Sequence, residues 1–325
     1  MQEHLSRNLG LDLVRVTEAA ALAAGRWMGF GDPDGADRAA TEAMIAAFAG
    51  IDIDGYIVIG EETKLGTHSP LDTGHRVGNR NGPEADVVVD AIDGARILAK
   101  SHPGAMSVIG AAARGSMLSL YPAVYMDKII VSRGAAASLV PECMNAPAAW
   151  TLALVARVTK KSVRDLVVFV LDRPRHQHLI EEIRSAGARI LLRSEGDVSG
   201  ALAAATCSKV DILMGSGGVP EGLIAACAVK AVGGAMLARL APQSAEERAA
   251  VEAAGLDTQR IYTCDDLVAG RKIIFVATGI TDGVLLSGVR YLGHEGHTES
   301  MVLRCETGSR RVIQAVHTIE RAEQT

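Results

Sequence analysis

The sequence predicts an α/β protein whose pattern changes near residue 146, which suggests two domains at residues 1–145 and 146–325. Short apolar runs that end at glycine or acidic residues are typical of buried strands. After residue 146 such runs alternate with helix-like segments, the pattern of a sheet with helices on both faces. They lie at residues 166–171, 188–192, 210–214 and 273–277. With 48% hydrophobic and 22% charged residues, the composition is that of an ordinary globular protein.

The N-terminal segment has the pattern of an amphipathic helix with one buried face. Its apolar residues recur at steps of three and four, at Leu9, Leu13, Val16, Ala20, Ala23 and Trp27. After a loop rich in glycine and aspartate, Asp37 is predicted to cap a helix that closes at Gly50. Residues 56–59 follow as a strand, which ends in an acidic turn that contains Glu61.

The run at residues 85–90 contains three consecutive valines and reads as a buried strand. It ends in Asp90, and Asp93 follows just before Gly94. Two carboxylates in a partly buried site cannot both stay ionised and unpaired, so this strand end suggests a functional site. Further strands of an antiparallel or mixed sheet are predicted at residues 106–112, 117–121 and 125–131.

Two turns in the C-terminal half carry charged residues next to helix starts. Pro174 is expected in the first turn of a helix, with Arg173 and Arg175 on either side of it. The turn Glu195-Gly196-Asp197 is predicted to cap the helix that runs through residues 201–205. We interpret the apolar stretch at residues 223–240 as core rather than as a membrane span, because Lys230 and glycines interrupt it.

Charge and cysteine content narrow the class of protein. A net charge of −5 and the absence of a basic stripe argue against nucleic-acid binding. The first residues lack a basic region followed by an apolar stretch, so no signal peptide is expected. Five scattered cysteines without a CxxC motif suit reduced thiols, and we therefore expect a cytoplasmic protein.

Carboxylates that follow strands or loops form a candidate metal site. They are Asp37, Glu61, Asp90, Asp93 and Glu221. Mg²⁺ and Mn²⁺ prefer such oxygen ligands and add water and substrate phosphate; each residue also fits a solvated turn or a helix cap. Arg173 and Arg175 suit a phosphate group, or else an exposed basic turn. The glycines at 215–218 do not have the dinucleotide-binding spacing.

Several motifs in order along nearly the whole chain resemble class II, GlpX-type fructose-1,6-bisphosphatases, which belong to the lithium-sensitive, metal-dependent phosphatases. The matching motifs are Arg15–Ala23, Gly31-Asp32 with Ala36-Asp37, Ile53–Gly55, Ile57–Glu61, Tyr125–Lys128, Pro174–His176, Glu195–Val198, Gly217-Gly218 with Pro220–Gly222, and Ala277–Thr281. The resemblance implies a layered αβαβα sugar-phosphatase fold with two sheets, and a requirement for Mg²⁺ or Mn²⁺. It also implies a metal-binding N-terminal domain and a sugar-phosphate-binding C-terminal domain.

By position, the resemblance assigns roles to individual residues. It makes Asp37, Glu61, Asp90, Asp93 and Glu221 metal ligands, the first four of them catalytic. The substrate-contacting positions are Asp93, Gly94, Ala95, Tyr125, Arg173, Arg175, Glu195, Asp197 and Gly218. The implied reaction is hydrolysis of fructose 1,6-bisphosphate to fructose 6-phosphate and phosphate. A homo-oligomer, dimer or tetramer, is expected, with neither nucleic-acid nor membrane partners.

Several positions depart from the family pattern at the expected site, among them Ala91 in place of proline and Glu62-Thr63 in place of Gly-Glu. Ala95 replaces a threonine that helps to hold the attacking water, unless Ser101 or Glu62 takes over that role. Asp93, Arg173 and Glu195 stand where the family usually has Glu, Lys and Asp. Two alternatives therefore stay open: a phosphatase for another sugar or polyol phosphate of the heptose or inositol type, and a catalytically weakened homologue that binds sugar phosphate.

Overall fold

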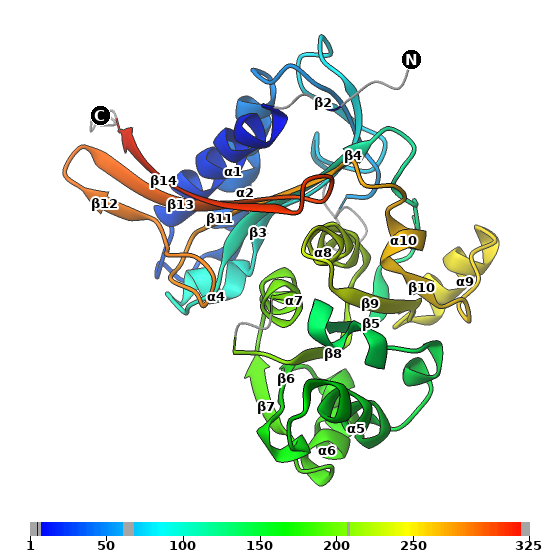
Figure 1. Cartoon of the computed structure of the whole chain (residues 1–325). Coiled ribbons are helices and arrows are strands. Elements are labelled where there is room, and N and C mark those ends of the chain that lie inside the picture. The colour runs from blue at the N-terminus through cyan, green and yellow to red at the C-terminus, as the bar shows by residue number, and fades with distance from the viewer. Residues whose placement is uncertain (1–4, 6–7, 61–67, 207–208, 320–325) are drawn as a thin grey trace.

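The computed structural model describes residues 5, 8–60, 68–206 and 209–319. Two mixed sheets and three layers of helices alternate in the order αβαβα, as expected (Figure 1). Helices α1 and α2 cover the outer face of the larger sheet, α7 and α8 lie between the sheets, and α5 and α6 cover the outer face of the smaller one. The α/β fold class and its layers are thus confirmed.

The larger sheet has eight strands in the described residues. Their order is β12-β13-β11-β4-β3-β1-β2, with β14 on the other edge of β13. The strands are β1 (Asp54–Ile57), β2 (Arg76–Val77), β3 (Glu84–Asp93), β4 (Met106–Ala113), β11 (Ile273–Gly279), β12 (Arg290–Leu292), β13 (Glu295–Arg304) and β14 (Ser309–Thr318). Only β1 and β3 pair in parallel, so the sheet is largely antiparallel.

Helices α1 (Leu9–Gly25) and α2 (Pro33–Phe48) form the outer layer on this sheet. Their apolar faces share a core with β3 and β4, which explains the predicted periodicity of α1. The predicted cap of α2 was wrong. The helix begins four residues before Asp37, because Pro33 fits its first turn and the Asp32 carboxylate accepts a hydrogen bond from the Gly35 N–H at 2.9 Å.

In the part of the chain that the structure describes, the smaller sheet has six strands in the order β10-β9-β5-β8-β6-β7. They are β5 (Tyr125–Val131), β6 (Val167–Leu171), β7 (Arg189–Arg193), β8 (Ile212–Gly218), β9 (Ala235–Leu240) and β10 (Tyr262–Thr263). Helices α5 (Ala148–Thr159) and α6 (Gln177–Ser185) cover its outer face. The proposed division at residue 145 stays a prediction, since strands from both halves contribute to both sheets.

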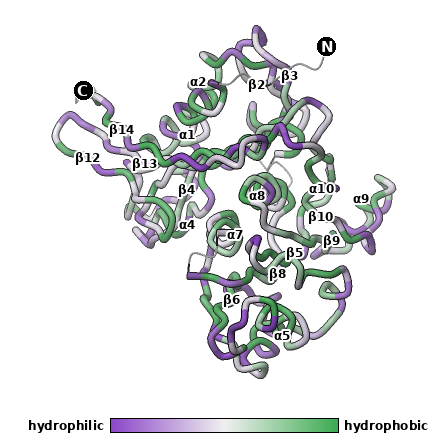
Figure 2. The backbone as a smooth tube through the Cα atoms, viewed as in Figure 1, coloured by the Kyte–Doolittle hydropathy of each residue, from purple (hydrophilic) through white to green (hydrophobic). Residues whose placement is uncertain are grey.

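The middle layer consists of α7 (Asp197–Ala205) and α8 (Val219–Ala231). Every residue of α8 except Lys230 is buried, since both sheets pack against this helix, and Figure 2 shows it as mostly apolar. The interpretation of this stretch as core is confirmed. In the described part of the chain no helix is long and apolar enough to cross a membrane.

The remaining helices are short connections: α4 (Ala95–Ala99), α9 (Ala245–Ala253) and α10 (Cys264–Leu267), with 3-10 turns at Arg133–Ser138, Pro141–Met144, Val163–Asp165 and Pro174–His176. The predicted strand at residues 117–121 is absent; Met117 makes a single bridge to Val268 there. The turn Glu195-Gly196-Asp197 caps α7 as predicted, with Gly196, in the left-handed conformation, at the N-cap position.

Candidate active site

The end of β3 places two buried carboxylates beside the middle layer. Asp90 and Asp93 are each only 4% exposed, and the pairing of β3 with β4 shifts register between them. Asp90 Oδ1 accepts the Ile92 N–H at 3.0 Å, and Asp93 Oδ2 accepts the Ser199 N–H at the start of α7, also at 3.0 Å. The strand is longer than predicted, because this shift lets β3 continue through both aspartates.

Gly94 turns the chain from β3 into α4. Its φ of +106° is a conformation that favours glycine, and a Cβ at this position would lie 2.9 Å from the Ile97 side chain. Ala95 is therefore the first residue of α4, directly beside the two aspartates in sequence. The position that the resemblance links to the attacking water thus lies at this strand end.

Glu195 connects α4 to the loop before α7. Its Oε2 accepts the Arg96 N–H at 2.8 Å, and its Oε1 lies 3.4 Å from Nη2 of Arg173. Two residues that the resemblance assigns separately to substrate are thus in contact with each other. The contact holds the loop that follows β6 against the end of the larger sheet.

Asp197 pairs with Lys128, which is 1% exposed although it lies on an apolar strand. Gly217 lies beside this pair on the neighbouring strand β8, and a Cβ there would collide with Oδ2 of Asp197. Burial of two charges is costly unless they meet each other, so the pair fixes the carboxylate at the start of α7. Sequence reasoning gave Lys128 no role; its signal is a lysine between Met126 and the apolar residues 129–131.

Arg175 and Tyr125 form a second part of the site at the edge of the smaller sheet. The Arg175 guanidinium carbon lies 5.1 Å from the centre of the Tyr125 ring, and Nη2 donates to the Ser216 carbonyl at 2.9 Å. Burial lowers the pKa of Arg175, while the Asp197 and Glu221 carboxylates oppose that shift. The guanidinium is thus held in place with donors to spare for an anion.

His176 supports the arrangement of Arg175 and Ser216, a role that was not predicted from the sequence. Its Nε2 accepts the Ser216 N–H at 2.7 Å, so the proton is on Nδ1, which donates to the Leu171 carbonyl at 2.7 Å. Burial lowers the pKa of the imidazole, which keeps it neutral. The ring therefore positions the β8 end and does not serve as a base. The signal available in the sequence was its place directly after Arg175.

Glu221 lies in the first turn of α8 and is buried. Its carboxylate lies so near Gly218 that a Cβ there would collide with it. Gly218 pairs with Tyr125 in the sheet, because β8 continues past the predicted run at 210–214 through the glycines that follow it. The structure thus brings Glu221 and Gly218 together beside Tyr125.

Of the other two predicted ligands, Asp37 is the one that the structure describes. Asp37 lines a separate cavity of about 590 Å³ together with residues 68–72, Val89 and Ala91. Because side chains alternate along a strand, Val89 and Ala91 face the outer helices, whereas Asp90 faces the middle layer. Glu61 lies outside the described residues.

The described carboxylates can be compared with what a divalent cation needs. No three carboxylate, imidazole or thiolate groups within the described ranges lie close enough to hold an ion. Asp90 and Asp93 at the end of β3, and Glu221 in the first turn of α8, nevertheless offer buried oxygen donors. This donor chemistry fits Mg²⁺, which takes one or two protein carboxylates and completes its shell with water and substrate phosphate.

Two sheets around buried helices, with buried carboxylates at the end of β3 and at the starts of α7 and α8, are the arrangement that the resemblance implied for a sugar phosphatase of the αβαβα type. Residues 7–317 match the family described as bacterial fructose-1,6-bisphosphatase, glpX-encoded. The chain belongs to this family of phosphoric monoester hydrolases, whose members depend on metal.

Similar curated proteins cover almost the whole chain. The chain is 36% identical over 330 residues to the class 2 fructose-1,6-bisphosphatase of Haemophilus influenzae. The matched region covers 97% of this chain and 98% of that protein. It is 35% identical over 340 residues to the D-fructose 1,6-bisphosphatase class 2/sedoheptulose 1,7-bisphosphatase of Synechococcus sp. strain JA-3-3Ab, with 96% of each chain covered.

Proposed function

We propose that this protein hydrolyses fructose 1,6-bisphosphate to fructose 6-phosphate and phosphate. The observation that carries the proposal is the arrangement around the start of α7, where Asp93 accepts the Ser199 N–H, Lys128 pairs with Asp197, and the Asp197 and Glu221 carboxylates act on the pKa of Arg175. Membership of the family and the names of the relatives support the same substrate. A location in the cytoplasm and a dimeric or tetrameric state stay predictions.

In this proposal Asp37, Glu61, Asp90, Asp93 and Glu221 hold Mg²⁺ or Mn²⁺. The ion, when bound, offsets negative charge on the phosphoryl group and favours ionisation of the attacking water. Water attacks phosphorus, the bond from phosphorus to the sugar oxygen breaks, and the sugar oxygen gains a proton. Asp93 and Gly94 position the reacting phosphoryl group at the end of β3.

The substrate's distal end is assigned to the smaller sheet. Arg175 and Tyr125 hold the second phosphate group, because a guanidinium binds phosphate through two parallel hydrogen bonds. Asp197 and Gly218 approach the sugar, with Asp197 fixed by Lys128. Arg173 and Glu195, already in contact, close the side of the site next to α4.

Replacing Arg175 by alanine is expected to raise KM for fructose 1,6-bisphosphate by roughly 10- to 100-fold, since a charge-assisted hydrogen bond is lost. The effect on a monophosphate that lacks the distal group should be much smaller. Steady-state phosphate release on both substrates measures the difference. Arg184→Ala, at an exposed position of the neighbouring α6, is the control and should change neither KM. Equal effects of Arg175→Ala on both substrates would place Arg175 away from the distal phosphate.

Ala95→Thr is expected to raise kcat on the order of 10²-fold and to leave KM nearly unchanged, because the hydroxyl restores a hydrogen bond to the attacking water. Ala95→Val adds the same number of heavy atoms without the hydroxyl and should give no gain. Comparison of kcat for the wild type and both variants tests the role of the hydroxyl. A gain with valine, or none with threonine, would show that another group such as Ser101 already holds the water.

A heptose bisphosphate is the second candidate substrate, because the name of the Synechococcus relative gives both a fructose and a sedoheptulose bisphosphatase activity. A phosphate-release screen over sugar mono- and bisphosphates with Mg²⁺ and Mn²⁺ separates the candidates. The proposal predicts the highest kcat/KM for fructose 1,6-bisphosphate. A higher kcat/KM for a heptose bisphosphate would make that sugar the preferred substrate. Binding of a sugar phosphate without turnover would favour the alternative of a catalytically weakened homologue.

A further inference from the structure

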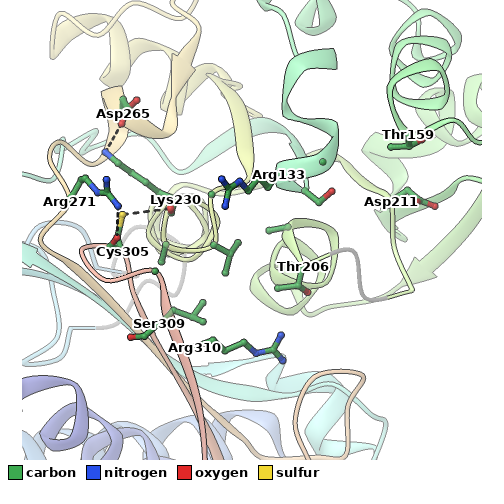
Figure 3. A pocket seen from close by; sticks show the side chains of 18 of the residues that line it. Arg133, Thr159, Thr206, Asp211, Lys230, Asp265, Arg271, Cys305, Ser309 and Arg310 are labelled. Carbon is green, nitrogen blue, oxygen red and sulfur yellow. Dashed lines mark hydrogen bonds and ion pairs between the residues drawn. The ribbon is translucent and has the colours of Figure 1, made fainter.

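A second cavity lies at the far end of the two buried helices. It has a volume of about 1110 Å³. Its walls are formed by the C-terminal ends of α7 and α8, by the turn after β5 and by the turn between β13 and β14 (Figure 3). Glu221 is at the start of α8 and Lys230 near its end, so at 1.5 Å per residue the cavity is roughly 15 Å from the candidate active site. The two sites share no lining residue among those named above.

The lining of this cavity carries more positive than negative charge. Its cationic side chains are those of Arg133, Lys161, Lys230, Arg271 and Arg310, and its anionic ones are those of Asp211 and Asp265. Both lysines are paired: Lys161 Nζ lies 2.5 Å from Asp211 Oδ1, and Lys230 Nζ lies 2.5 Å from Asp265 Oδ1. Three arginine charges therefore remain without a matching carboxylate in the lining.

The ends of α7 and α8 balance only part of this charge. The C-terminal end of a helix carries about half a negative charge, so two ends offset roughly one of the three arginines. Arg271 is held by the Cys305 carbonyl, to which its Nη2 donates at 3.2 Å. An excess of about two positive charges remains in a concave site.

Arg133 and Arg310 are the groups best placed to meet a ligand. Both are exposed, and within the described part of the chain neither guanidinium forms a hydrogen bond or ion pair. Figure 3, which looks along the helices, shows the two side chains on opposite sides of the helix ends. Arg133 comes from the smaller sheet's side and Arg310 from the larger sheet, so one ligand between them would contact both halves of the fold.

We propose that this cavity is a binding site for a small anion that carries two or more phosphate groups, with Arg133 and Arg310 as its contacts. Guanidinium groups match phosphate oxygens through two hydrogen bonds each, and two of them on opposite sides require separated anionic groups. A volume of about 1110 Å³ accommodates a molecule of nucleotide size rather than a single phosphate ion. The proposal does not depend on the proposed catalytic function.

Calorimetric titration of the full chain with tripolyphosphate tests the site. Arg133→Gln and Arg310→Gln should each weaken binding by roughly 10- to 100-fold, because each removes charge-assisted hydrogen bonds. Both variants should keep wild-type phosphate release. Arg175→Ala, in the candidate active site, should leave this binding intact, which separates the two phosphate sites.

Arg311→Gln is the matched control. Arg311 follows Arg310 on β14 and does not line the cavity, although its Nη1 donates at 2.9 Å to Oγ of Ser309, which does. It should change the affinity by less than about twofold. The proposal would be overturned if Arg133→Gln and Arg310→Gln bound tripolyphosphate as tightly as the wild type, or if Arg311→Gln bound it as weakly as they do. It would also be overturned if the wild type did not bind millimolar tripolyphosphate.

Discussion

Asp90→Asn is expected to lower metal-dependent phosphate release on the order of 10³-fold, while the protein stays folded. Loss of a ligand charge removes several kcal/mol of stabilisation from the transferring phosphoryl group. The fold should survive because an asparagine Oδ1 can still accept the Ile92 N–H that Asp90 accepts now. Phosphate release at saturating Mg²⁺, with a thermal unfolding curve of each protein, measures both effects.

Asp86→Asn is the control for this substitution. Asp86 lies on the same strand, is 3% exposed, and accepts the Met117 N–H at 2.9 Å away from the candidate site. Its variant should keep phosphate release within a few-fold of the wild type, whatever it does to stability. If Asp90→Asn kept wild-type turnover, or if both variants lost activity equally, Asp90 would not be a metal ligand.

Lys128→Met is expected to lower the free energy of unfolding by about 3–5 kcal/mol, because it leaves the buried Asp197 carboxylate without its partner. Methionine fills much of the volume of the lysine stem, so the loss reflects mainly the unpaired charge. Urea unfolding monitored by circular dichroism gives the difference in free energy.

The double variant Lys128→Met/Asp197→Leu separates charge from packing. Replacing both members of a buried ion pair by apolar residues is often neutral or stabilising. We therefore expect the double variant to regain most of the stability, though not the activity. A double variant as unstable as Lys128→Met alone would mean that the site depends on the packing of Lys128 and not on its charge pair.

Local patterns predicted most of the elements but not their partners. The apolar periodicity of α1 and the valine run of β3 reflect faces that are buried in the structure. The same runs could not show that β11 inserts beside β4, since that pairing joins residues far apart in sequence. The strands at 290–318 were not predicted. β14 is an edge strand with mostly exposed side chains, and the buried positions in the first part of β13 are Gly296, Thr298 and Ser300, which give no apolar alternation.

The residues of the candidate site could also be predicted, but not the contacts that hold them. Resemblance by position named Asp93, Asp197 and Arg175, and the structure shows what holds them: the Ser199 N–H, Lys128 and the Ser216 carbonyl. None of these contacts could be read from spacing, because each joins different elements. Asp37 was mistaken for a cap because its position before an apolar run resembles a helix start, while Asp32 and Pro33 form the actual start.

The measurement that tests the central claim most directly is phosphate release from fructose 1,6-bisphosphate by the purified wild-type chain. It is made first after treatment with EDTA and then with Mg²⁺ or Mn²⁺ restored. The proposed function predicts no release without metal, recovery with at least one of the two ions, and formation of fructose 6-phosphate in equal amount. Release that is unaffected by EDTA, or none with either ion, would contradict it.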